Sequence, residues 1–215
     1  DWYLYQTAIE TKIVYKLSGR DVQVLAIKAG EESLLPSKAR VSAIVLAAGK
    51  PDYGDTLPIS RVAETFLSAG IDDLIVVLGY HAEQAKKDLW GKDVKIIVNP
   101  GYEHGLSSSL RYGLRMVSRD TAAVALTLGN LPYIKPEVVA KLIGIYKRGA
   151  APIIAPTYSQ MRGHPVIFDT LLIPELIRAK GNIGGRGVLQ HHSRESVQFE
   201  VEDAGILKQV EKRLN

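Results

Sequence analysis

Short apolar stretches alternate with segments of helical period through most of this chain. The first, at 41–46, is a continuous apolar run, which is typical of a strand buried on both faces of a sheet. Further strands are expected at 74–78, 94–98 and 122–128. Strands that alternate with helices in this way form βαβ units around a mostly parallel sheet. The sequence therefore predicts an α/β fold for residues 41–215.

The remaining regular segments continue the alternation. Gly70 after one amphipathic segment and Pro136 in the first turn of another are typical helix boundaries. From residue 206 onward we expect a terminal helix or strand. Helices are expected at 61–69, 81–89, 107–117, 136–146, 171–178 and 187–191, and short strands at 153–155, 165–168 and 197–201.

The N-terminal part follows a different pattern. Residues 2–17 and 21–29 are rich in aromatic and β-branched side chains, which favours two strands, and a turn signal separates them. Residues 31–38 have the composition of a linker. The sequence predicts a β-hairpin extension with its linker over residues 1–40, followed by the α/β domain at 41–215.

Composition excludes several classes of protein. Hydrophobic residues make up 46% of the 215 residues, which is enough for a sizeable core. The absence of cysteine excludes disulfides, thiolate metal sites and a cysteine nucleophile. No apolar run approaches the roughly 20 residues of a membrane span, and the charges are interspersed rather than gathered into a basic block. We therefore expect a cytoplasmic protein that binds neither membrane nor nucleic acid.

Ligands of parallel sheets bind at the carboxyl ends of the strands, so the loops there are the candidate site. The first strand is followed by Ala47, Ala48, Gly49 and Lys50. Small residues let backbone N–H groups approach a phosphate, and the lysine can neutralise its charge, although a tight turn gives the same pattern. In a later loop the amide oxygen of Asn130 can ligate a cation without contributing negative charge.

Two other loops carry polar side chains that suit an anion. Ser107, Ser108 and Ser109 precede an apolar helical run, where a serine can cap the helix or add to an anion site. Arg162 and His164 lie in a turn that contains glycine. The arginine can reach an anionic ligand, or the segment can be a surface turn.

Two further features are not expected to carry chemistry. The glycine-rich segment at 181–186 follows a helix rather than a strand, which favours a flexible connection between helices. His191 and His192 are adjacent, and neighbouring residues on a helix point apart. Because no nearby carboxylate completes a ligand set, we do not expect a metal there.

Taken together and in order, these loops resemble those of the molybdenum cofactor cytidylyltransferases, a branch of the MobA-like nucleotidyltransferases. The resemblance covers about residues 41 to 211. Its motifs are VLAAG at 45–49, RVAE at 61–64, VVLG at 76–79, NP at 99–100, GLSSSLR at 105–111, LGNLP at 128–132, RGHP at 162–165 and GNIG at 181–184.

The resemblance implies a three-layer Rossmann-like fold of the glycosyltransferase-A type. It also implies transfer of a nucleoside monophosphate from CTP or GTP to molybdopterin, with Mg²⁺ and with release of pyrophosphate. The nucleotide would then be bound by Leu46, Ala47, Ala48, Gly49, Gly79 and Asn99, and the acceptor by Ser107, Ser108, Ser109, Arg162 and His164. Molybdoenzyme maturation proteins are the partners that such a role implies.

The sequence departs from the family's pattern where charge is needed. After the LAAG motif the family has an arginine and a lysine in a longer loop, whereas this chain has only Lys50. Two aspartates of the family are replaced by Asn130 and Asn182, and of a C-terminal metal-binding segment only Glu211 keeps a carboxylate. The implied catalytic set is Lys50, Asn130 and Glu211, with a weakened Mg²⁺ site at Asn130 and Glu211.

Three functions agree with these observations. The first is an active nucleotidyltransferase acting on a pterin-type acceptor. The second is a relative impaired in catalysis that binds nucleotide or cofactor as a chaperone or regulator. The third is transfer to a sugar phosphate or another alcohol phosphate on the same fold.

Overall fold

The computed structural model describes residues 2–7, 11–18, 21–28, 39–50 and 58–210. At the N-terminus, β1 (Trp2–Thr7), β2 (Thr11–Ser18) and β3 (Asp21–Lys28) form an antiparallel sheet in the order β1-β2-β3. The prediction of one strand over 2–17 is therefore wrong, because this segment forms two strands. A third strand gives β2 a partner on each side, which a hairpin lacks. The predicted linker at 31–38 lies outside the described residues.

The second sheet has eight strands in the order β11-β8-β10-β7-β4-β5-β6, with β9 paired to β8. Neighbouring strands are parallel, except that β10 is antiparallel to both β7 and β8, and β9 is antiparallel to β8. The strands are β4 (Arg40–Ala47), β5 (Asp73–Leu78), β6 (Lys95–Val98), β7 (Thr121–Leu128), β8 (Ile153–Tyr158), β9 (Met161–Arg162), β10 (Val166–Asp169) and β11 (Ser196–Glu200).

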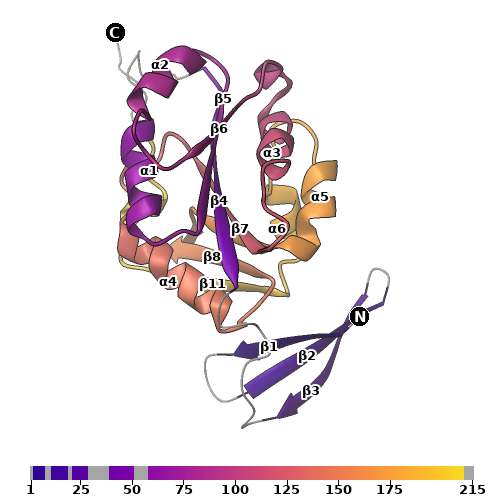
Figure 1. Cartoon of the computed structure of the whole chain (residues 1–215). Coiled ribbons are helices and arrows are strands. Elements are labelled where there is room, and N and C mark those ends of the chain that lie inside the picture. The colour runs from indigo at the N-terminus through magenta and orange to yellow at the C-terminus, as the bar shows by residue number, and fades with distance from the viewer. Residues whose placement is uncertain (1, 8–10, 19–20, 29–38, 51–57, 211–215) are drawn as a thin grey trace.

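Helices cover both faces of this sheet (Figure 1). On one face lie α1 (Ile59–Ser68), α2 (Ala82–Asp88) and α4 (Pro136–Lys147), and on the other lie α3 (Leu106–Leu114), α5 (Ile173–Arg178) and α6 (Arg186–His191). Two apolar cores result, one containing Phe66 and Tyr146 and the other Leu110 and Phe168. The predicted α/β fold with three layers and a mostly parallel sheet is confirmed.

The chain order of the strands determines where a ligand can bind. From β4 the chain adds β5 and β6 on one side and then returns to place β7 on the other side of β4. The loops that follow β4 and β7 therefore leave from the carboxyl ends of two adjacent parallel strands, where the strand order reverses. Ligands of such sheets bind in the crevice outside these ends. Both the LAAG segment and Asn130 lie at this switch point.

The C-terminal part differs from the prediction. After the 3₁₀ helix η3 (Ala204–Ile206), residues 207–210 form no regular element, so the expected terminal helix or strand is wrong for them. The backbone N–H of Val210 donates a hydrogen bond of 3.0 Å to the carbonyl oxygen of Asn130, which fixes this segment beside the crevice. The chain also contains η1 (Tyr102–His104) and η2 (Thr170–Leu172). No described helix is long and apolar enough to cross a bilayer.

Candidate functional site at the switch point

Backbone hydrogen bonds fasten three loops together at the carboxyl ends of the strands. The N–H of Gly129 donates to the carbonyl oxygen of Leu46, and the N–H of Tyr80 donates to that of Ala48, each at 2.9 Å. A Cβ atom at Gly79 would lie 2.5 Å from the Ala48 oxygen, and one at Gly129 would lie 2.5 Å from the Ala47 Cβ. The small residues therefore allow the loops to contact one another. This packing between the loops is sufficient to require small residues here, even when no ligand is bound.

The end of the first loop faces solvent. Gly49 and Lys50 are exposed, and a Cβ at Gly49 would have nothing within 4 Å. The Lys50 Nζ lies 5.7 Å from the ring centroid of Tyr80, which in turn stacks on His81 at 3.9 Å. Tyr80 was not predicted as a site residue, although it directly follows the VVLG motif. A cation and an aromatic surface thus adjoin the open end of the loop.

Asn99 holds the start of α3 through hydrogen bonds made entirely inside the protein. Its Nδ2 donates to Ser108 Oγ at 3.1 Å and to Ser109 Oγ at 3.0 Å, and its Oδ1 accepts from the Gly101 N–H at 3.0 Å. The side chains of Asn99, Ser108 and Ser109 are buried. Direct contacts from these three residues to a ligand stay a prediction, whereas their role in positioning the adjacent loop is visible.

Replacing Asn99 by alanine is expected to lower the free energy of unfolding by about 1–3 kcal/mol, because the buried Ser108 and Ser109 hydroxyls each lose a hydrogen bond and the Gly101 N–H loses its acceptor. Urea denaturation followed by circular dichroism measures this change. Gln84→Ala is the matched control, because this amide side chain is exposed and its hydrogen bond to Asp88 lies in solvent. Equal losses in the two variants would contradict the role assigned to Asn99.

The loop at 181–186 is held against the N-terminal turn of α3. The Ser107 N–H donates to the Gly181 carbonyl oxygen at 2.9 Å, and the Gly184 N–H donates to Ser107 Oγ at 3.3 Å. Asn182 Oδ1 accepts the otherwise unpaired Leu106 N–H at 3.2 Å. The expectation that a serine caps α3 is wrong, because the helix begins at Leu106 and the side-chain acceptor comes from Asn182.

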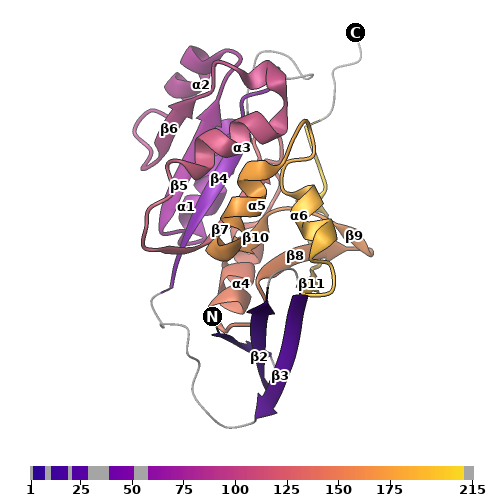
Figure 2. The ribbon, with the colours of Figure 1, turned by 90° about the vertical axis from the view of Figure 1, so that its right-hand side faces the viewer.

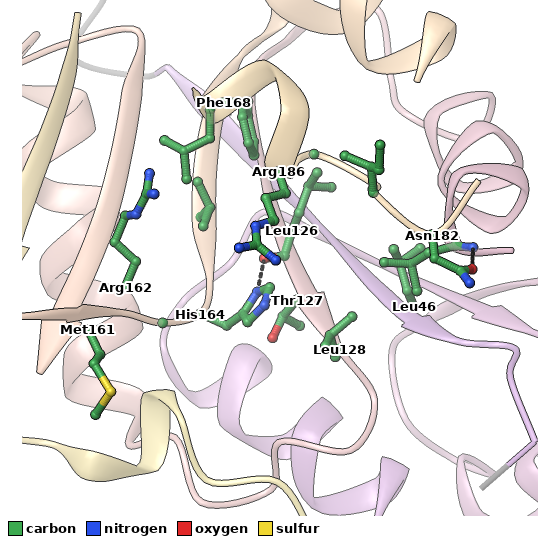
Figure 3. Close-up of a pocket in the computed structure, with 16 residues that line it drawn as sticks. Leu46, Leu126, Thr127, Leu128, Met161, Arg162, His164, Phe168, Asn182 and Arg186 are labelled. Carbon is green, nitrogen blue, oxygen red and sulfur yellow. Dashed lines mark hydrogen bonds between the residues drawn. The ribbon is translucent and has the colours of Figure 1, made fainter. Parts of the chain in front are cut away.

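A pocket of about 540 Å³ adjoins the LAAG segment (Figure 3). Arg162, His164 and Arg186 provide its basic side chains, and Leu46 belongs both to the pocket and to the loop after β4. Arg186 was not selected as a site residue from the sequence, because its segment follows a helix. The rest of the lining is mostly apolar: Leu106, Leu126, Leu128, Met161, Val166, Phe168, Ile183 and Leu189, with Thr127, Gly163, Asn182 and Gly185.

His164 contributes an uncharged ring to this pocket. Its burial lowers the pKa of the imidazole below the usual value, and the hydrogen bond between Nδ1 and the Leu126 carbonyl oxygen, 3.4 Å long, acts in the opposite direction. At neutral pH the two arginines therefore supply the positive charge, while His164 offers a neutral polar edge.

The lowered pKa of His164 predicts how stability depends on pH. Between the folded-state pKa and the unfolded value of about 6.5, the unfolded chain binds the proton that the folded chain excludes. The contribution of neutral His164 to the free energy of unfolding is therefore fully present above about pH 6.5. As the pH falls below that value, the free energy of unfolding decreases by at most about 1.4 kcal/mol per pH unit. His164→Gln should show a flatter decline between pH 7.5 and 5 in urea titrations, whereas the exposed-site control His104→Gln should keep the wild-type slope.

Asn130 lies at the end of β7, where the family pattern has an aspartate. Its Nδ2 donates to Gln209 Oε1 at 3.1 Å, while its Oδ1 is buried and has no hydrogen-bond partner among the described residues. The hydroxyl oxygen of Thr127, on β7, is likewise buried without a hydrogen-bond partner among the described residues. Glu211, the predicted carboxylate partner of Asn130, lies outside the described residues.

The expectation that His191 and His192 lack a nearby carboxylate is wrong. Helix α6 ends at His191, so the two rings lie close together, with centroids 4.9 Å apart. Glu175 from α5 lies beside them, and ligand atoms of the three side chains are all within 4.8 Å of one another. The sequence separation of 17 residues between Glu175 and His192 concealed this contact.

The parallel sheet, its switch-point crevice and the loop of small residues define a three-layer nucleotide-binding α/β domain. The chain belongs to a more particular group: residues 43–197 match the MobA-like NTP transferase domain family. The predicted family is thus confirmed, and membership supports a transferase.

Individual relatives agree with this assignment. The nicotine blue oxidoreductase of Paenarthrobacter nicotinovorans is 27% identical over 175 residues, which is 70% of this chain and 81% of that protein. A crystal structure of Rv0371c from Mycobacterium tuberculosis superposes with a TM-score of 0.66 at 25% identity, covering 76% of this chain and 88% of that chain. Rv0371c also has a crystal structure in complex with manganese, at 27% identity and with the same TM-score and coverage.

Proposed function

We propose that the protein transfers a nucleoside monophosphate from CTP or GTP to molybdopterin or a similar phosphorylated acceptor. The observation that carries this proposal is the position of Leu46, which belongs both to the loop of small residues and to a pocket with two arginines. A nucleotide on the loop and an anionic acceptor in the pocket would meet there. The product would pass to a molybdoenzyme maturation protein.

On the nucleotide side, the loop end at Gly49 offers backbone N–H groups to phosphate oxygens without an obstructing side chain. Lys50 supplies the nearby positive charge, and the stack of half-buried Tyr80 on exposed His81 offers a flat surface to a base. Asn99 contributes by holding the neighbouring loop through its internal hydrogen bonds.

On the acceptor side, the lining suits a flat ring with an anionic group. Leucine side chains and Phe168 can contact the faces of a heterocycle, and the neutral His164 can hydrogen-bond to its edge. Arg162 and Arg186 can bind the phosphate, because a guanidinium group matches its geometry with paired N–H donors. The uncharged middle of the pocket favours an aromatic acceptor over a sugar phosphate.

The proposed reaction needs positioning rather than an enzyme nucleophile. An oxygen of the acceptor phosphate attacks the α-phosphorus of the nucleoside triphosphate. A new P–O bond forms as the bond to the β-phosphate bridge breaks, and pyrophosphate leaves with the electron pair. Lys50 and the two arginines would reduce the repulsion between the two anionic reactants.

The residues present fit a weakly held divalent cation. The buried, unpartnered Oδ1 of Asn130 is available as an oxygen ligand, but it carries no negative charge. When bound, the cation would supply further neutralisation of phosphate charge. Asn130 would hold it together with the phosphate oxygens of the nucleotide, and Glu211 stays a proposed additional ligand.

The neutral Asn130 and Asn182 also favour a second candidate, a relative that binds nucleotide or cofactor without transferring it. The relative from Paenarthrobacter nicotinovorans is named an oxidoreductase rather than a transferase, which supports this second candidate. Loss of metal-binding charge would impair transfer more than it would impair binding of the base and phosphates.

Calorimetric titration with CTP, GTP and ATP, each with and without Mg²⁺, separates the two candidates. An active transferase is expected to bind one triphosphate more tightly with the metal, and to release pyrophosphate when molybdopterin is added. Lys50→Ala should weaken triphosphate binding, and the exposed control Lys87→Ala should not. Binding that is indifferent to Mg²⁺, with no pyrophosphate, would support the second candidate and exclude the first.

A further inference from the structure

A cluster of imidazole and carboxylate groups joins α5 to the C-terminal end of α6, and these two helices are neighbours in Figure 2. His192 Nε2 lies 3.0 Å from both carboxylate oxygens of Glu175, so the end of α6 is fastened to α5. His191 adds a second imidazole, and one ligand atom from each of the three residues lies within 4.8 Å of the others. None of these residues lines the pocket described above.

A fourth residue approaches the same histidine from its other side. Glu195 Oε2 lies 3.9 Å from His192 Nδ1, and this oxygen is buried without a hydrogen-bond partner among the described residues. A buried carboxylate oxygen without a donor is costly. A His192 tautomer with its proton on Nδ1 would direct that N–H group toward the Glu195 oxygen and reduce this cost.

We propose that Glu175, His191 and His192 form a binding site for a divalent transition metal of the zinc class. A proton on Nδ1 of His192 leaves Nε2 as a lone-pair donor directed toward Glu175. Two imidazoles and a carboxylate are ligands that Zn²⁺ accepts, whereas Mg²⁺ prefers oxygen ligands alone. Glu195 would then act as the carboxylate that orients a metal-binding histidine.

The spacing of the ligand atoms is compatible with this assignment. Tetrahedral zinc with ligands at about 2.1 Å holds them about 3.4 Å apart. The Glu175–His192 pair is already closer than that, and the exposed His191 can rotate to approach it. Because three protein ligands leave one tetrahedral position open, water would complete the coordination.

The alternative is an ion pair between a doubly protonated His192 and Glu175. That pair would account for the contact of His192 with Glu175, but it gives His191 no role. A metal involves all four side chains. It would also place a cation at the C-terminal end of α6, where the helix dipole favours positive charge.

The site has a structural consequence for the pocket. Helix α6 has six residues, begins at the pocket residue Arg186 and ends at His191. A metal that joins its far end to α5 would restrict movement of the whole helix. Metal binding is therefore expected to stabilise the fold and to keep Arg186 in place, without contact between the metal and the acceptor.

The test is a calorimetric titration of the full chain, free of any histidine tag, with ZnCl₂ and separately with MgCl₂. We expect one equivalent of Zn²⁺ to bind, Mg²⁺ not to compete, and Tm to rise with zinc and return after chelation. His191→Ala and Glu175→Gln should each weaken zinc binding at least about tenfold, and Glu195→Gln by about 10- to 100-fold with unchanged stoichiometry.

His104→Ala is the matched control, because it removes an exposed histidine outside the cluster. It should leave zinc binding unchanged. Absence of saturable zinc binding, or equal affinity in His191→Ala and the wild type, would overturn the proposal. Since His191 is exposed, its replacement should not prevent folding, and circular dichroism of the metal-free variant verifies this.

Discussion

Alanine at Arg162 or at Arg186 is expected to raise the KM for a phosphorylated pterin acceptor by roughly 10- to 150-fold. Both side chains line the pocket beside Leu46, and few other groups there can offset the charge of a phosphate. A hydrogen bond to a charged group contributes about 1.5–3 kcal/mol, and each 1.4 kcal/mol changes an affinity about tenfold. The effect on KM for the nucleoside triphosphate should be much smaller, because the proposed function places that substrate on the loop after β4.

Initial rates of pyrophosphate release at varied acceptor concentration measure this difference. Arg162→Lys and Arg186→Lys should recover part of the loss, since lysine keeps the charge but not the paired donors. Arg178→Ala is the matched control, because this arginine of α5 is exposed and does not line the pocket. A loss that falls on the triphosphate instead of the acceptor would reverse the assignment of the two sides.

The sheet could be predicted because its central strands are buried on both faces. Residues 41–48 are all buried, and such burial requires a continuous apolar run that is visible in the sequence. Single residues likewise marked helix ends, as at Gly70, which has a φ of +76° after α1. Strand β9 has two residues, both exposed, so no apolar pattern indicates it.

The candidate site could be predicted only as a set of loops. Its contacts join residues that are far apart in the chain, such as Ser107 with Gly184 and Asn130 with Gln209, which are 77 and 79 positions apart. A motif shows which residue type is present, but not which neighbour satisfies it. Asn99 and the serines therefore suggested ligand contacts, whereas the structure gives them internal partners. Arg186 was passed over because the position of α6 depends on tertiary packing.

The second large effect is expected from restoring a carboxylate at the end of β7. Asn130→Asp keeps the size of the side chain and adds a negative charge where Oδ1 is buried and unpartnered. The Gln209 amide, which now accepts from Asn130 Nδ2, can rotate to donate to the new carboxylate. Two opposite unit charges about 4 Å apart attract by about 1 kcal/mol in water and about 4 kcal/mol near a protein surface, and a divalent cation doubles this.

Asn130→Asp should therefore tighten binding of the Mg²⁺ or Mn²⁺ complex of the triphosphate at least about tenfold. Without metal, the same variant should bind the triphosphate more weakly, because the carboxylate repels the phosphates. Calorimetry with and without metal measures both changes. Gln198→Glu controls for net charge, since it adds a carboxylate at an exposed position of β11, and Asn130→Ala controls for loss of the oxygen. The opposite signs of the two changes are the decisive feature: a uniform rise or fall would mean that residue 130 affects the nucleotide directly and that no cation binds beside it.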